Sequence, residues 1–186
     1  MKKPILLILS LGLILTLSFA EKKSKFIILI TEQNIQGPQR VWWATEVDLS
    51  ITEGTLAQRL INQGYEIIDP SSVNKIISQN KAFRIVDLSE PKAVRLGRLS
   101  KADFVILGKA IASGGGSVPQ SNLRSCFANI TVRLIRVKDG KVIAYLDASG
   151  KSAHLDLITA GKEALINAGQ ELGEKIIEVL SKEGGK

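Results

Sequence analysis

The sequence is poor in the residues that carry catalysis and metal binding. Its 186 residues include one histidine and one cysteine, and aromatic residues make up only 5%. With a single cysteine, no intrachain disulfide can form. With a single histidine, the chain lacks the second histidine ligand found in many zinc sites. No nucleophile partner is evident for His154, which we interpret as an exposed residue of a linker between a strand and a helix.

Nothing else in the sequence assembles a recognisable reaction centre. The glycines at 114–116 lack the Lys-Ser/Thr ending of a phosphate-binding loop. Asp48, Asp87 and Asp103 border expected elements and form no evident carboxylate pair, and Asp69 is expected to cap a helix. We therefore predict that the protein is not an enzyme and that it holds no catalytic residues, no cofactor and no metal.

The charge is basic but scattered. Lys and Arg number 25 against 18 Asp and Glu. The densest basic stretch, Lys92, Arg95 and Arg98 at helical spacing, has no neighbouring aromatic residues to stack bases, so we interpret it as a solvated helix face. We expect no nucleic-acid partner, while peripheral association with a membrane or the cell wall stays open.

Residues 1–20 have the pattern of a secretory signal peptide. Lys2 and Lys3 precede the apolar run 5–17, and small residues stand at Ser18 and Ala20. An uncleaved anchor is the alternative, but the run is shorter than the ~20 residues that span a bilayer. We expect a periplasmic or secreted domain over 21–186. No cysteine near the cut offers a lipid acceptor.

The remaining pattern predicts a mixed α/β (α+β) fold in one domain. Unbroken apolar runs at 25–31 and 104–107 are typical of central strands, and residues 65–68 of a short one. Helices are expected after Ser50, after Asp69, from residue 89 to 101 and from 157 to 180. We expect two or three layers, with about four helices flanking a mixed sheet of about five strands.

A long antiparallel hairpin is expected around Lys138, Asp139 and Gly140. A two-residue turn at Asp139-Gly140 would place Asp147 opposite Val132 on the core face, so we prefer a three-residue loop with Gly140 in a left-handed bulge. That register makes one face apolar and places the lone cysteine in the core. The expected pairs are Leu134 with Ala144, Val132 with Leu146 and Ile130 with Ala148, with Cys126 on the same face.

Two loops stand out between the predicted elements. The glycines at 114–116, followed by Pro119, predict a flexible break between strands. The segment 32–50 is long for a loop and carries Trp42 and Trp43. Either both rings cover the end of the sheet, or one of them contacts a partner, so Trp42 and Trp43 are our candidate partner-binding residues.

Together these features resemble the middle domain of flagellar assembly protein T and the wider CsgG-like group. That group includes the curli secretion component and the outer-membrane activators of penicillin-binding proteins. The resemblance rests on Thr31-Glu32-Gln33-Asn34, Trp42 and Trp43, residues 60–76 (LINQGYEIIDPSSVNKI), residues 102–108 (ADFVILG), and Lys138-Asp139-Gly140.

This resemblance implies a small α/β domain outside the cytoplasm that binds other envelope proteins. We expect an exported, non-enzymatic adaptor or assembly protein, in a flagellar or secretion apparatus or elsewhere in the envelope. A periplasmic solute- or glycan-binding protein, or an activator of peptidoglycan synthesis, is the alternative. The identity of the partner and self-association of the chain stay open.

Overall fold

The computed structural model describes residues 23–40, 49–83 and 88–184. The predicted signal peptide, 1–20, and the pair Trp42 and Trp43 lie outside these ranges. The elements in chain order are β1 Lys25–Asn34, β2 Gly37–Arg40, α1 Ile51–Asn62, β3 Glu66–Ile67, α2 Pro70–Gln79, the short 3-10 helix η1 Lys81–Phe83, α3 Glu90–Leu99, β4 Phe104–Ser117, β5 Arg124–Arg136, β6 Val142–His154 and α4 Leu157–Gly184.

The strands form one mixed sheet in the order β2-β1-β4-β5-β6, and β3 also pairs with β1. β1 runs parallel to β4, whereas β4, β5 and β6 form an antiparallel meander. Since β4 occupies one edge of β1, β2 and β3 share the other edge at its opposite ends. This confirms the predicted fold class, including the mixed sheet and the long antiparallel hairpin.

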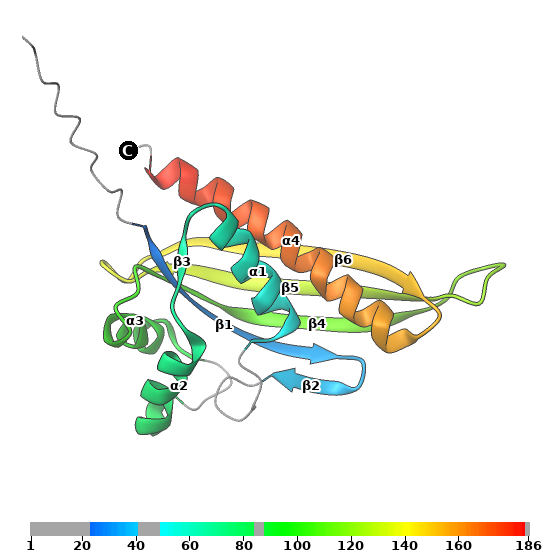
Figure 1. Ribbon diagram of the computed structural model, residues 1–186, viewed down its shortest axis with the longest axis horizontal. Coiled ribbons are helices and arrows are strands. Elements are labelled where there is room, and N and C mark those ends of the chain that lie inside the picture. Colours follow the sequence, from blue (N-terminus) through cyan, green and yellow to red (C-terminus); the bar gives the residue numbers. More distant parts are fainter. Residues whose placement is uncertain (1–22, 41–48, 84–87, 185–186) are drawn as a thin grey trace, which may run out of the picture.

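Helices cover the two faces of the sheet unequally (Figure 1). α1 and α4 pack on the first face, where α4 runs along the meander. α2 and α3 pack on the second face at one end only. Two separate cores result. The first includes Phe26, Ile28, Ile30, Leu56, Leu60, Ile106, Cys126, Val132, Leu172 and Ile176, and the second includes Ile27, Leu29, Val73, Ile77, Phe83, Leu96, Val105, Leu107 and Ile135.

The β5–β6 hairpin has the predicted register. Ile130 pairs with Ala148, Val132 with Leu146 and Leu134 with Ala144. Cys126 is fully buried on that face, as predicted.

The predicted position of the bulge was wrong. Gly140 does have a left-handed φ of +73°, but the register shifts between Leu134 and Ile135, where Ile143 is the extra residue. The N–H of Arg136 donates to the carbonyl of Lys141, so four residues form the loop. Ile143 consequently packs in the first core rather than on the second face.

The predicted flexible break at 114–116 was also wrong. β4 continues through these glycines to Ser117 and pairs with β5 as far as Arg124, so only residues 118–123 form the turn. The register shifts between Gly114 and Gly116, which makes Gly115 a bulge, and Gly116 has a φ of +97°. Glycine here accommodates a bulge within a strand instead of ending it.

The helix boundaries follow the predicted caps. Ser50 and Glu53 form the predicted capping box of α1, and Asp69 caps α2 before Pro70. Leu99, the last residue of α3, is 52% exposed, because Ala93 and Gly97 face the sheet.

Two glycines of α4 allow α1 to pack closely. A Cβ atom added at Gly169 would lie 3.2 Å from Thr55, and one added at Gly173 would lie 2.7 Å from Arg59.

Two buried carboxylates tie the start of α1 to β1. Glu53 is fully buried, and its Oε1 accepts from the Ile30 N–H at 2.8 Å while its Oε2 accepts from the Ser50 N–H at 2.9 Å. Glu32, only 2% exposed, accepts from the Thr52 N–H at 2.8 Å. Both side chains lie at the N-terminal end of α1, where backbone N–H groups have no acceptor within the helix. α1 is therefore held in place by polar contacts as well as by its apolar side.

We predict that Glu53→Ala lowers the free energy of unfolding by about 2 to 3 kcal/mol, because it leaves two backbone N–H groups without their buried acceptor. Glu66→Ala is the control. It removes an exposed ion pair with Lys25 and should cost about 0.5 kcal/mol or less. Urea unfolding followed by circular dichroism measures both, and equal losses for the two variants would show that the buried carboxylate does not anchor α1.

Candidate functional site

The second face of the sheet is uncovered over the far half of the meander. Arg133 marks the boundary, since its guanidinium contacts Glu90 of α3 at 3.3 Å. Beyond it the outward side chains of three strands are exposed, and we call this surface the open face. It consists of Lys109, Ile111 and Ser113 of β4, Phe127, Asn129 and Thr131 of β5, and Tyr145, Asp147, Ser149 and Lys151 of β6.

Ile111 and Phe127 form the apolar part of the open face. Each is 48% exposed. Ile111 pairs with Asn129, and Ser113 pairs with Phe127, so the two apolar side chains are diagonal neighbours on adjacent strands. Such neighbours have Cα atoms about 7 to 8 Å apart, close enough for one partner residue to contact both.

The ring of Phe127 is held on one side by the glycine bulge. A Cβ atom added to Gly115 would lie 2.2 Å from Cε2 of Phe127 and 2.7 Å from Oγ of Ser125. The ring therefore lies against the bare backbone of Gly115 and leaves its other side exposed. An aromatic ring fixed in this way loses little conformational entropy when a partner binds it.

The rest of the open face is polar. Across the strands Lys109 pairs with Thr131 and Thr131 with Asp147, while Asn129 pairs with Ser149. Tyr145 is 69% exposed at the boundary beside Arg133. Aromatic anchors within a hydrogen-bonding surface are typical of protein interfaces.

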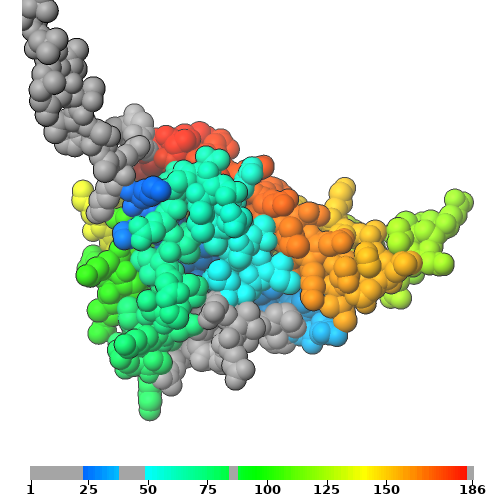
Figure 2. Space-filling model, in the orientation of Figure 1, coloured from blue at the N-terminus to red at the C-terminus, as the bar shows by residue number. Residues whose placement is uncertain are grey.

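The end of the β4–β5 hairpin extends this surface. Figure 2 shows its green tip projecting beyond the start of α4. A hydrogen bond of 2.9 Å from the Val118 N–H to the Leu123 carbonyl closes the tip. Residues 119–122 of the tip are exposed.

The structure does not test the sequence-based candidates Trp42 and Trp43, which lie outside the described residues. The last described residue before them, Arg40, pairs with Glu32 at the β2 edge of the sheet. The first described one after them, Leu49, packs beside the first core. The role of the two tryptophans stays a prediction.

Cys126 and His154, the two side chains with reactive chemistry, both make structural contacts. Cys126 is fully buried, its Sγ lies 3.5 Å from the carbonyl of Leu157, and burial raises the pKa of the thiol. His154 is not in a linker as expected but is the half-buried last residue of β6, where Nδ1 accepts from the Asp156 N–H at 3.1 Å. Both residues help to connect the meander to α4.

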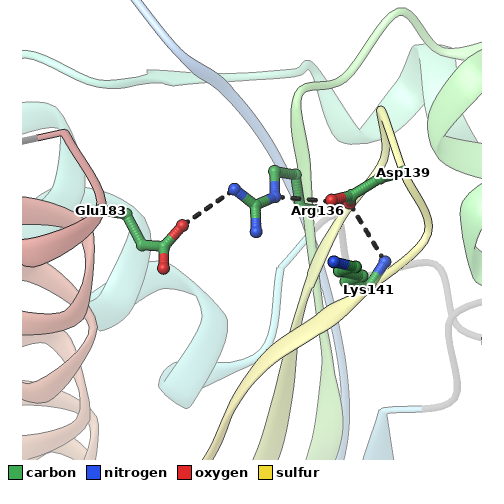
Figure 3. A network of polar contacts seen from close by, with 4 residues as sticks. All are labelled: Arg136, Asp139, Lys141 and Glu183. Atoms are coloured by element: carbon green, nitrogen blue, oxygen red, sulfur yellow. Dashed lines mark hydrogen bonds and ion pairs between the residues drawn. The ribbon is translucent and has the colours of Figure 1, made fainter. Parts of the chain in front are cut away.

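A network of polar contacts lies at the turn of the β5–β6 hairpin, at the other end of the meander from the β4–β5 tip (Figure 3). Arg136 contacts Glu183 of α4 at 2.9 Å and Asp139 of the turn at 3.4 Å, and Asp139 accepts from the Lys141 N–H at 3.2 Å. An open hollow beside this network is lined by Arg98, Lys101 and Lys138 among others. Because two carboxylates neutralise Arg136, we infer that the role of the network is to join α4 to the hairpin.

Two classes of feature are absent from the described ranges 23–40, 49–83 and 88–184. No three His, Cys, Asp or Glu side chains gather there in a way that could bind a metal ion. No helix in the same part of the chain is long and apolar enough to cross a membrane.

No protein-family model matches the chain, and no curated protein matches it either. Solved structures do match. The LpoB C-terminal domain from Salmonella enterica is 18% identical over 72% of this chain and 83% of that one, with a TM-score of 0.40. The lipoprotein GNA1162 from Neisseria meningitidis is 18% identical over 88% of this chain and 99% of that one, with a TM-score of 0.45. The PelC dodecamer from Paraburkholderia phytofirmans is 14% identical over 81% and 87%, with a TM-score of 0.39.

The penicillin-binding protein activators, one of the groups that the sequence resembles, are represented among these structures by LpoB. No comparison supports the resemblance to flagellar assembly protein T or to the curli secretion component. Matches at these identities and TM-scores do not carry a partner or an activity from those proteins to this chain.

Proposed function

We propose that this chain is a non-enzymatic adaptor of the cell envelope that binds another envelope protein through the open face. The observation that carries the proposal is the exposure of Ile111 and Phe127, at 48% each, as neighbours on a sheet whose other face is covered. Side chains of this size are normally buried when a helix layer covers the strand that carries them. Here the positions belong to a surface that the chain itself leaves uncovered.

The size of the open face bears on how a partner binds. Strands lie about 4.8 Å apart and rise about 3.3 Å per residue, so three strands over about five to seven residues each span roughly 300 Å². A standard interface buries about 800 Å² on each partner. The open face alone therefore supports a transient complex. A stable one needs further surface, which the hairpin tip and the predicted Trp42 and Trp43 contact would supply.

The envelope location rests on the signal-peptide pattern of residues 1–20. Among envelope partners, we place a peptidoglycan synthase ahead of a flagellar or secretion component, because the activators of penicillin-binding proteins are the resembled group that the comparisons also support. Solute or glycan binding is the second candidate, and it requires an enclosed polar pocket. The hollows beside Arg98 and between α1 and α4 open to solvent, which favours the protein partner.

We predict that Ile111→Thr combined with Phe127→Thr weakens binding of a purified envelope partner at least tenfold, since the loss of two neighbouring anchors would together cost about 1.4 kcal/mol or more. Threonine keeps the preference for a strand, so the sheet should persist. Surface plasmon resonance with purified peptidoglycan synthases measures the effect.

The matched control for the open-face variant is Ile61→Thr on α1, because Ile61 is 49% exposed and lies off the open face. It should leave the affinity unchanged within about twofold. If Ile61→Thr weakens binding as much as the double variant, the partner does not use the open face. If no synthase binds wild type, while cell-wall fragments raise its melting temperature, glycan binding replaces the proposal.

We further predict that the residues outside the described ranges contribute to the same complex. Trp42→Ala or Trp43→Ala should weaken partner binding about tenfold or more if one ring is an interface anchor, because truncation of an anchoring tryptophan typically costs about 2 kcal/mol or more. Thermal unfolding separates the alternatives. Loss of stability with unchanged affinity in both variants would mean that both rings cover the sheet instead.

A further inference from the structure

The outer edge of β6 is the last strand edge of the sheet on that side. β6 is 13 residues long and pairs with β5 along its other edge. In an antiparallel edge strand, alternate residues direct both the N–H and the C=O away from the sheet. A long edge of this kind can pair with a strand from another molecule unless something covers it.

Three side chains of α4 cover the middle of this edge. Asn167 Nδ2 donates to the Lys151 carbonyl at 2.9 Å. The Ser149 N–H donates to Glu171 Oε2 at 3.2 Å, and Lys175 Nζ donates to the Asp147 carbonyl at 2.7 Å. We call Asn167, Glu171 and Lys175 the edge guard.

The spacing of the edge guard matches the spacing of the strand. Residues four apart on a helix are separated by about 6 Å along its axis, and residues two apart on a strand by about 6.7 Å. Asn167, Glu171 and Lys175 are four apart, and they contact three alternate residues of β6. Lys175 also contacts Glu171 at 2.6 Å. The Lys175 ammonium and the Ser149 N–H hold the pKa of Glu171 below its usual value, so the acceptor stays ionised at neutral pH.

We propose that the outer edge of β6 is a strand-pairing surface for a second copy of this chain, and that the edge guard keeps it closed. Two copies can pair antiparallel about a two-fold axis, which brings the same residues together from both molecules. Removal of the guard frees the backbone groups of Asp147, Ser149 and Lys151. These groups then find partners in the second copy.

The charges of the edge select both the occupant and the register. With the axis at Ser149, the Asp147 of each copy lies opposite Lys151 of the other, which gives two opposite-charge pairs. Cross-strand pairs of opposite charge stabilise an antiparallel ladder, and like charges destabilise it. A register shifted so that the axis passes through Asp147 or Lys151 would bring like charges together. The sequence of the edge is therefore complementary to itself in one register.

The test compares two triple variants that remove the same chemical types from α4. Asn167→Ala/Glu171→Ala/Lys175→Ala removes the edge guard. Lys162→Ala/Gln170→Ala/Glu174→Ala removes an amide, a carboxylate and an ammonium that are exposed elsewhere on the helix. Alanine favours the helix in both cases. Sedimentation velocity should show a species of about twice the wild-type mass for the guard variant only.

Charge substitutions at the edge then distinguish strand pairing from nonspecific self-association. In the guard variant, Lys151→Asp places like charges opposite each other and should weaken self-association about tenfold. Adding Asp147→Lys to it restores opposite charges and should restore self-association. Recovery in this exchanged variant supports the register about Ser149.

Several results would overturn the proposal. A guard variant with the same mass distribution as wild type at all concentrations would do so, and so would equal self-association of the two triple variants. If neither charge substitution changes the self-association, another surface mediates it. If the guard variant loses its circular dichroism signal, the single variant Glu171→Ala, which frees the Ser149 N–H alone, takes its place with the same criteria.

Discussion

The lengths of the helices and strands set the shape of this protein. Strands of the meander have 13 or 14 residues and extend about 45 Å, and α4, with 28 residues, extends about 42 Å. α4 can therefore cover one face from end to end. α2 and α3 have ten residues each, about 15 Å, and cover only part of the other face. The open face is a direct consequence of this difference.

The same helix links the parts of the molecule on which both proposals depend. Its inner side closes the first core, where a Cβ atom at Gly150 would lie 2.1 Å from the carbonyl of Ala164, so helix and strand are in backbone contact. Its flank covers the edge of β6, and its end reaches the hairpin through Glu183 and Arg136. The proposed strand pairing at the edge therefore depends on the position of α4, whereas the open face lies on the side of the sheet that α4 does not cover.

Much of this fold could be predicted from the sequence, because the relevant signals are local. Ser50 with Glu53, and Asp69 before Pro70, define helix starts within a few residues, and each of these caps is present. The register of the hairpin also followed from alternation, since the alternative placed Asp147 on the apolar face.

The open face itself was missed for a specific physical reason. Glycines at 114–116 were interpreted as a break, although a glycine bulge lets a strand continue, so Ile111 and Phe127 were not assigned to one surface. The available signal was the alternation of side chains between the two faces over residues 126–130, because it places Phe127 on the face opposite Cys126 and Ile130. The edge guard could not have been predicted, since it joins residues 16 to 28 positions apart through helix side chains and strand backbone.

Contact of a partner with the open face can be tested in the cell by site-specific photocrosslinking, with a photoreactive phenylalanine analogue placed at Phe127 and, in a separate strain, at Ile61. We expect an ultraviolet-dependent adduct of defined mass from Phe127 and none of that mass from Ile61. The same adduct from both positions, or from Ile61 alone, would contradict it.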